Sequence, residues 1–252
     1  MKVDLHFHAK ERSGCSASSE EELIQAAIDY GLEGLAFTDH GRLVSEKRLA
    51  QLNEKFVPFR VFGGIEISVE EGEDVLVFGV QDRVLERVKW KYADLHEFVR
   101  KCEGGIILAH PFRYRDHINI DAEARKPDAI ELHSINIGIC DEAKILALAR
   151  QVGCHTICNS DAHWEDHVGL YHVDIQGRPE NDAGLVSLIR YGAFEWRCDT
   201  ERVAIFNGNV HKRENLIRQL ISEGRNRLYY REKTGDWEGY FDRVAMGKSY
   251  II

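Results

Sequence analysis

Two histidines, two residues apart, lie in the hydrophobic segment MKVDLHFH at the start of the sequence. His6 and His8 belong to a wider pattern, because five further hydrophobic segments also carry histidine or carboxylate side chains at or near their ends. The residues that complete this pattern are Asp39, His40, Glu66, His110, Glu131, His133, Asp161 and His163. Its repetition predicts one shared site rather than scattered packing residues.

The chemistry that these groups suit is metal binding. Side chains at positions i and i+2 of a strand point to the same face, so His6 and His8 can face one site. Asp161 and His163 can do the same if their strand extends that far. Imidazole and carboxylate ligands suit Zn²⁺, Mn²⁺ or Fe²⁺. The ligands outnumber what one tetrahedral ion needs, which predicts two or three ions, and such paired ions commonly hydrolyse phosphate esters.

Simpler roles stay open for single members of the pattern. A carboxylate at a strand end often caps the next helix, and Asp39 and Asp161 could each do so. Most single histidines pack or form hydrogen bonds, which is the expectation for His96, His117, His155, His172 and His211. His167 is assigned to a loop.

The predicted elements alternate between strands and helices. Strands are expected over 3–7, 32–40, 59–68, 74–80, 105–111, 127–134, 154–163 and 169–175. Helices are expected over 16–31, 46–56, 94–104, 140–153 and 181–192, the first with a capping box of Ser18 and Glu21 and an exit at Gly31. This alternation predicts an α/β fold with a parallel sheet curved into a barrel, complete or distorted. The carboxyl ends of its strands would converge on one mouth.

The C-terminal segment differs in composition. We expect residues 1–198 to form the barrel and residues 199–252 to form a helical and aromatic cap, packed on the barrel within the same domain. Its aromatic side chains either cover the mouth, where they could stack on a base, or pack within the cap; they are Trp237, Tyr240 and Phe241.

Composition narrows the classes of function. The chain has 252 residues and a net charge of −9, which disfavours broad nucleic-acid binding and favours a small phosphorylated substrate, with nucleic acid only as a short substrate. Six cysteines without a CxxC pair predict reduced thiols and a cytoplasmic location. No hydrophobic run is long enough to predict a membrane span. An oligomeric state is not predicted.

The motifs DLHFH, FTDHG, GIEIS, LAHPFR and NSDAH, in this order, resemble those of the PHP (polymerase and histidinol phosphatase) superfamily of metal-dependent phosphoesterases. The resemblance spans residues 3 to about 175. It implies a distorted (β/α)7 TIM-like barrel with two or three ions at its mouth, and Asp39 orienting His40. It also implies the metal ligands, which are the catalytic residues: His6, His8, His40, Glu66, His110, Asp161 and His163.

Two positions depart from the family pattern. Members commonly have an aspartate ligand a few residues after the HxH motif, where this chain has Ser13, Gly14 and Cys15. Members often have a histidine at the start of the strand after the glutamate motif, where Asp74 is nearest here. Whether Asp74 or Cys15 binds a metal stays open, as it does for Glu131 and His133. A catalytically weak metal-binding module is one alternative that these departures allow.

The predicted activity is hydrolysis of a phosphate ester of a small metabolite or nucleotide, with a metal-bridging hydroxide as the nucleophile. The substrate phosphate needs a guanidinium partner, and the candidates are Arg113, in LAHPFR, and then Arg12 and Arg42. A histidinol-phosphatase-type enzyme is a second alternative, and a hydrolase of neutral substrates with an arginine-poor mouth is a third.

Overall fold

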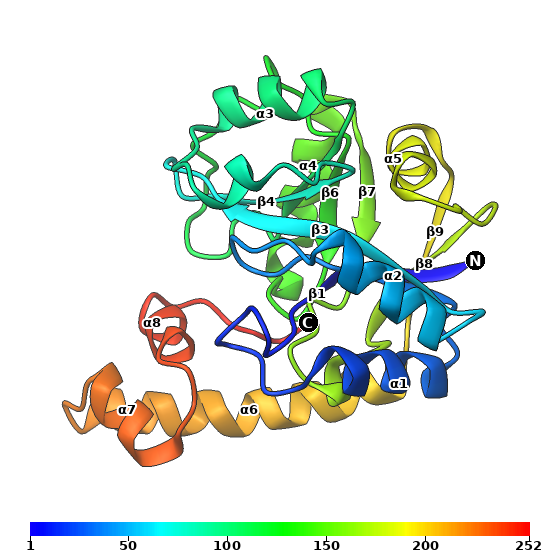
Figure 1. Cartoon of the computed structure of the whole chain (residues 1–252). Coiled ribbons are helices and arrows are strands. Elements are labelled where there is room, and N and C mark those ends of the chain that lie inside the picture. Colours follow the sequence, from blue (N-terminus) through cyan, green and yellow to red (C-terminus); the bar gives the residue numbers. More distant parts are fainter.

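The computed structural model describes residues 1–252, which form a curved sheet with helices around it (Figure 1). The strands are β1 Lys2–Phe7, β2 Gly34–Phe37, β3 Arg60–Ser68, β4 Asp74–Phe78, β5 Gly105–Ala109, β6 Ala129–His133, β7 His155–Cys158, β8 Tyr171–Ile175 and β9 Phe194–Cys198. The helices are α1 Glu20–Tyr30, α2 Glu46–Lys55, α3 Tyr92–Lys101, α4 Glu142–Val152, α5 Asp182–Tyr191, α6 Thr200–Ser222, α7 Arg227–Thr234 and α8 Gly239–Ala245. Three short 3₁₀ helices are η1 Arg83–Glu86, η2 Ile139–Asp141 and η3 Glu165–His167.

The first helix begins at a capping box one residue later than predicted. The Ser19 hydroxyl accepts a hydrogen bond from the Glu22 amide over 3.3 Å, and the Glu22 carboxylate accepts one from the Ser19 amide over 2.7 Å. The assignment to Ser18 and Glu21 was wrong because the Ser18 hydroxyl donates to the Glu165 carboxylate instead. The helix ends as expected at Gly31, whose φ of 95° is in the left-handed region that glycine adopts readily.

The sheet is mixed rather than parallel. Its order is β7-β6-β5-β4-β3-β2-β1-β8-β9. β4 runs antiparallel to both β3 and β5, and the other pairs among β1 to β7 are parallel. The expectation of a parallel sheet does not hold at β4, because residues 69–73 between β3 and β4 are too few for a crossover. The unpredicted strand β9 pairs antiparallel with β8, to which α5 connects it, and β8 pairs antiparallel with β1.

A bridge between Phe7 and Ala162 brings the two ends of the seven-stranded part together. The His8 amide donates to the Ala162 carbonyl over 2.9 Å, and the Ala162 amide donates to the His6 carbonyl over 3.0 Å. The segment after β7 therefore runs beside β1, and the sheet is nearly closed. This confirms the predicted α/β fold, a distorted barrel with C-terminal helices.

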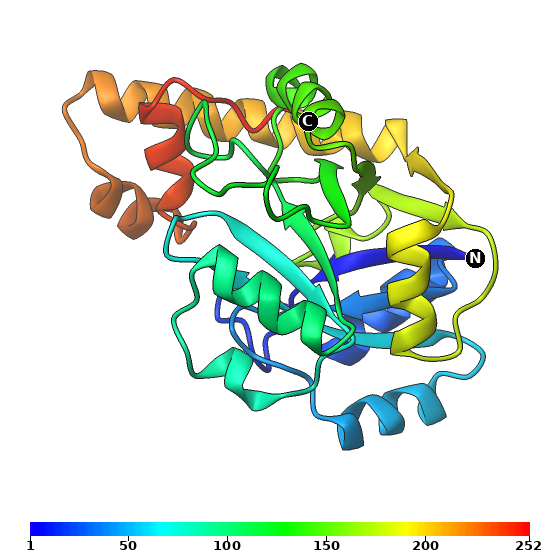
Figure 2. The same cartoon turned by 90° about the horizontal axis from the view of Figure 1, so that it is seen from above.

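The C-terminal helices contact the mouth end of the barrel. The long helix α6 lies along one side of the molecule, and α7 and α8 fold back from its end (Figure 1). Figure 2 shows α6 and α2 on opposite sides of the strands. The Arg243 guanidinium of α8 donates to the Asn136 carbonyl over 2.8 Å, and the Ile139 amide donates to the Ile251 carbonyl over 2.8 Å. No helix combines the length and the hydrophobicity that crossing a bilayer demands.

Candidate metal centre

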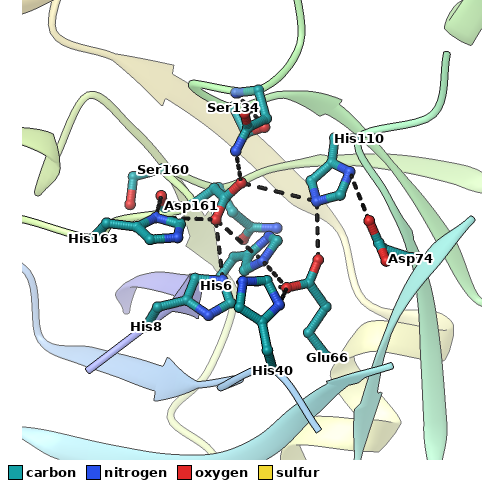
Figure 3. Close-up of polar contacts among 12 residues, drawn as sticks. His6, His8, His40, Glu66, Asp74, His110, Ser134, Ser160, Asp161 and His163 are labelled. Atoms are coloured by element: carbon teal, nitrogen blue, oxygen red, sulfur yellow. Dashed lines mark hydrogen bonds and ion pairs between the residues drawn. The ribbon is translucent and has the colours of Figure 1, made fainter. Parts of the chain in front are cut away.

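The structure brings all seven predicted ligands together at the carboxyl ends of the strands (Figure 3). His6 lies in β1 and Glu66 in β3, whereas the others follow the ends of β1, β2, β5 and β7. All are buried except His40, whose side chain is 44% exposed. The cluster is therefore buried on all sides except at His40, where it is accessible to solvent.

Four buried ligand atoms at the centre of this cluster form no hydrogen bond of good geometry, although Glu66 Oε2 lies 2.7 Å from His40 Nδ1: His6 Nε2, His8 Nε2, Glu66 Oε2 and Asp161 Oδ1. Asp161 Oδ1 lies 3.1 Å from His8 Nε2 and 3.4 Å from His6 Nε2. Glu66 Oε2 lies 3.4 Å and 3.7 Å from the same two nitrogens. Ligands about 2.1 Å from a tetrahedral ion are themselves about 3.4 Å apart, and His6, His8 and Glu66 form a first set that could hold such an ion.

Glu66 also contacts a second group of ligands. Its other oxygen, Oε1, lies 2.9 Å from His110 Nε2. Asp74 lies beyond, with Oδ2 3.8 Å from His110 Nδ1, and these three residues form a second set that could hold an ion. The Glu66 carboxylate thus lies between two candidate positions, which is the place of a bridging ligand.

A third set is formed by three imidazoles. The rings of His8 and His40 stack with centroids 4.3 Å apart, and those of His8 and His163 stack at 4.4 Å. Their ligand atoms lie close enough to hold an ion. The centre could therefore accommodate two or three ions.

The two carboxylates at the centre of the cluster are held in the ionised form, which is the form that binds a metal. Burial opposes ionisation of Glu66, but His40 and His110 hold the pKa of its carboxyl well below the usual range. His6 and His8 overcome burial in the same way and lower the pKa of Asp161. Burial and the neighbouring His163 and His40 lower the pKa of His8, which favours its neutral, metal-binding form.

Glu131 orients two of the histidines. Its Oε1 accepts from His6 Nδ1 over 3.0 Å, which directs His6 Nε2 into the cluster. Its Oε2 accepts from the His110 amide over 2.9 Å. His133, on the same strand, lies apart from the cluster and stacks on Tyr171 at 5.2 Å. Of Glu131 and His133, the two candidates in the segment AIELH, the structure therefore brings only Glu131 to the site.

Asp39 holds the loop after β1 rather than the ring of His40. Its carboxylate accepts from the Ala9 amide over 2.8 Å and from the Ser13 hydroxyl over 2.7 Å. It also accepts from Arg12 Nε over 2.6 Å. The expected orienting contact with the His40 imidazole is absent, because the carboxylate faces this loop.

Backbone strain is concentrated at the cluster. His110 and Asp161 adopt positive φ angles of 25° and 58°, and Phe112, two residues after His110, has a φ of 65°. Non-glycine residues rarely adopt this conformation, and those that do are often found at functional sites. The turns after β5 and β7 are thus shaped to direct these two side chains.

A cavity of about 460 Å³ opens beside the ligands. Its lining includes His40, Asp74, Asp161, His163, Arg113 and Trp237. Of the three predicted arginines, only Arg113 lies there. Arg12 is bound by Asp39 and Glu20, and the exposed Arg42 does not line the cavity.

A model of the PHP domain matches residues 4–243. The chain belongs to the PHP family. PHP proteins are generally metal-dependent phosphoesterases, and the cluster supplies the buried ligands that such an activity requires. No curated protein matches the chain significantly.

Solved structures share the PHP fold at low sequence identity. PsfC from Pseudomonas syringae is 17% identical, with a TM-score of 0.58 over 80% of this chain and 92% of that chain. A candidate metal-dependent phosphoesterase from Bifidobacterium adolescentis is 12% identical, with a TM-score of 0.55 over 74% and 96%. The lesion-specific endonuclease PfuEndoQ from Pyrococcus furiosus is 17% identical, with a TM-score of 0.57 over 77% of this chain and 57% of that chain.

Two buried side chains of this PHP site were not predicted from the sequence. The Ser13 hydroxyl lies 3.4 Å from His8 Nδ1 and links that ring to Asp39. Asp4 accepts hydrogen bonds from the amides of His6 and Ser160, over 3.2 Å and 3.1 Å. The spacing of Asp4, two residues before His6, was the available signal, because it puts both side chains on one face of β1.

Proposed function

We propose that this protein is a metal-dependent phosphoesterase that hydrolyses a phosphate ester of a small metabolite or nucleotide. The observation that carries the proposal is the convergence of buried imidazole and carboxylate ligand atoms next to a cavity that is also lined by the half-buried Arg113. The family to which the chain belongs supports the same class of reaction.

The residues have separate roles in this reaction. When bound, divalent ions would supply Lewis acidity and an activated water for attack on phosphorus. Glu66 and Asp161 would hold these ions as ionised carboxylates, and neutral His8 would contribute Nε2. Glu131 would keep His6 in the tautomer that presents Nε2 to the centre.

Arg113 is the proposed partner of the substrate phosphate. Its Nε atom is buried without a hydrogen-bond partner, and its guanidinium stacks between the rings of Tyr114 and Trp237 at 5.0 Å and 5.1 Å. A planar guanidinium held in this way can bind two phosphate oxygens at once. A half-buried cation at the mouth favours a phosphate ester over the neutral substrate of an amidase.

The wall of the cavity supports a substrate with a planar or apolar group. Trp237 and Tyr240 from the C-terminal segment line the cavity, together with Trp164 and Tyr114. Phe241 instead packs in a small cluster with Ile217 and Tyr230. A cavity of about 460 Å³ suits a small molecule or a short nucleic-acid end, and the acidic chain disfavours longer nucleic acid.

The test is a phosphatase panel on protein whose metal content is controlled. Protein stripped by a chelator and reloaded with Mn²⁺ or Zn²⁺ should hydrolyse p-nitrophenyl phosphate, a bis-ester or a nucleotide, and the stripped protein should not. Histidinol phosphate belongs in the panel because its hydrolysis would identify the alternative of a histidinol-phosphatase-type enzyme. Full metal loading without turnover of any substrate would contradict the proposal and favour a catalytically weak metal-binding module.

A further inference from the structure

The two oxygens of the Asp161 carboxylate have different surroundings. Oδ1 forms no hydrogen bond of good geometry and lies 3.1 Å from His8 Nε2 and 3.4 Å from His6 Nε2 (Figure 3). Oδ2 accepts a hydrogen bond from Nδ2 of the Asn136 side chain. A metal-binding carboxylate is ionised and can only accept hydrogen bonds, so the amide nitrogen is the atom of Asn136 that suits it. One oxygen of Asp161 is thus held by the protein, and the other is left for an ion.

Asn136 lies in the loop after β6, and this loop is bound to the turn that carries Asp161. The Ile135 amide donates to the Ser160 carbonyl over 3.2 Å, and the Asn136 amide donates to the Ser134 hydroxyl over 3.3 Å. Asn136 is buried and lines the cavity beside the metal centre. A buried polar contact is little weakened by water, so the Asn136 amide can fix the direction of the carboxylate.

The C-terminal segment holds Asn136 from another side. Nη1 of Arg243, on α8, donates to the Asn136 carbonyl over 2.8 Å. Arg243 is fully buried, and its guanidinium lies 4.0 Å from the centroid of the Tyr250 ring. Its Nε and Nη2 atoms form no hydrogen bond of good geometry. Burying a cation with so few polar partners costs stability, which favours a role for Arg243 in placing the loop.

The loop approaches the C-terminal segment closely at Gly138. A Cβ atom at this position would lie 2.7 Å from the Ser249 carbonyl oxygen and 3.1 Å from Arg243 Nη2. The C-terminal segment therefore packs directly against the backbone of the loop after β6. A continuous series of contacts runs from Arg243 through Asn136 to Asp161.

We infer that Asn136 is a positioning residue for the metal ligand Asp161, and that Arg243 positions Asn136 in turn. This role rests on the proposed metal centre and deepens it. The Asn136 amide restricts the Asp161 carboxylate to binding through Oδ1. Without the amide, Oδ2 is free to bind the same ion or to turn towards His110 Nε2, which is 3.9 Å away. The C-terminal segment thereby shapes the metal site without supplying a ligand to it.

Asn136→Leu tests the inner contact, because it removes the amide donor and leaves the ligands and α8 unchanged. The affinity of the variant for Zn²⁺ should decrease by about 10–100-fold, as measured by competition with a chromophoric chelator. At saturating Co²⁺, its visible absorption spectrum should differ from that of the wild-type protein, because this spectrum depends on the number and arrangement of the ligand atoms. A residue that only stabilised the fold would not change the spectrum of the saturated protein.

Asn207→Leu is the matched control. The Asn207 side chain of α6 holds the C-terminal residue, since it donates to the Ile252 carbonyl over 2.7 Å and accepts from the Ile252 amide over 3.0 Å. Its replacement loosens the C-terminal segment without removing a contact of Asp161. The affinity for Zn²⁺ and the cobalt spectrum should therefore stay as in the wild-type protein.

Arg243→Met tests the outer contact. The affinity for Zn²⁺ should decrease by about 2–10-fold, which is the typical contribution of one hydrogen bond. Because Arg243 acts through Asn136, the double variant should bind Zn²⁺ no more weakly than Asn136→Leu alone. Gly138→Ala displaces the same guanidinium without removing it and should have the same effect as Arg243→Met. Additive losses in the double variant would overturn the role of Arg243.

Two further results would overturn the role of Asn136. One is an affinity for Zn²⁺ or a cobalt spectrum that stays unchanged in Asn136→Leu, and the other is equal decreases in Asn136→Leu and Asn207→Leu. Both results leave the proposed phosphoesterase intact, because the wild-type ligands still bind metal. Wild-type protein that binds no metal would overturn the proposed function as well, so the two failures can be told apart.

Discussion

The carboxylate of Glu131 joins His6 to His110, accepting from His6 Nδ1 over 3.0 Å and from the His110 amide over 2.9 Å. Asn159 Nδ2 also donates to this carboxylate, so Glu131→Gln leaves one oxygen for three donors and removes the charge that fixes the His6 tautomer. Such orienting partners typically contribute about 10–100-fold to metal affinity or activity. We expect the metal affinity of the variant to decrease by about 10–100-fold, as measured by competition with a chromophoric chelator.

His133→Gln is the control for this prediction. His133 lies two residues further along the same strand but stacks on Tyr171, so its replacement should leave metal affinity unchanged. Equal effects of the two substitutions would show that Glu131 acts only through the stability of β6.

Arg113→Met tests the phosphate partner. A hydrogen bond to a charged group contributes about 1.5–3 kcal/mol, so kcat/KM for a phosphate ester should fall about 10–100-fold. Inhibition by inorganic phosphate should weaken in parallel, while the metal content stays the same. Arg150→Met, on α4, is the matched control. An unchanged inhibition constant for phosphate would exclude this role of Arg113.

Trp237→Ala tests whether the aromatic wall selects the substrate. Stacking on an aromatic side chain contributes about 1–3 kcal/mol per base, so KM for a nucleotide should rise at least about fivefold. KM for glycerol phosphate should rise less, because the Arg113 guanidinium keeps its contact with Tyr114 when the Trp237 ring is lost. Gly239→Ala is a second variant that tests the Trp237 ring, because the added methyl group would lie 2.3 Å from this ring and displace it. Equal changes for both substrates would mean that Trp237 only packs.

The regular placement of polar groups made the site predictable, and local irregularities limited the detail. His133 shares the i, i+2 spacing with Glu131, but a register shift between them breaks the alternation and turns His133 to Tyr171. Asp161 and His163 lie beyond the end of β7, so their convergence depends on a strained turn that no strand periodicity describes.

Long side chains were the least predictable part. Arg12 follows the first motif and Arg113 is the last residue of the fourth, but tertiary partners decide where each guanidinium lies. Asp39 and Glu20 bind Arg12 beside α1, whereas Arg113 stacks on two aromatic rings at the cavity. One partner, Trp237, comes from the C-terminal segment, so its contact with Arg113 could not be read from local sequence.

Metal removal should lower the stability of the protein. Without an ion, four buried ligand atoms form no hydrogen bond of good geometry, and two of them belong to ionised carboxylates. A ligand at about 100 times its Kd stabilises a protein by about 3 kcal/mol. For a domain of this size, we expect a chelator to lower Tm by roughly 5–10 °C, and re-addition of metal to restore it. Identical Tm values for loaded and stripped protein would contradict the buried site.

His167 provides a pH-dependent test of the packing behind the centre. It is buried beside Phe206 and Trp164, and its Nδ1 accepts from the His163 amide over 3.3 Å. Burial and the nearby His163 lower the pKa of His167 to about 3. The pKa of a histidine in an unfolded chain is about 6.5. Between about pH 6.5 and pH 3 the unfolded chain therefore binds more protons than the folded protein, and stability falls as the pH falls.

From pH 7 to pH 5 this difference should cost the wild-type protein roughly 2 kcal/mol of unfolding free energy. His167→Gln removes the titrating group. Between pH 7 and pH 5 the variant should therefore lose roughly 2 kcal/mol less unfolding free energy than the wild-type protein, whatever the stability of the variant at pH 7. Urea unfolding in the presence of chelator measures both slopes without interference from bound metal. The exposed His117→Gln serves as the control and should keep the wild-type slope. Parallel pH dependences for wild type and His167→Gln would show that His167 is not held in its neutral form by the fold.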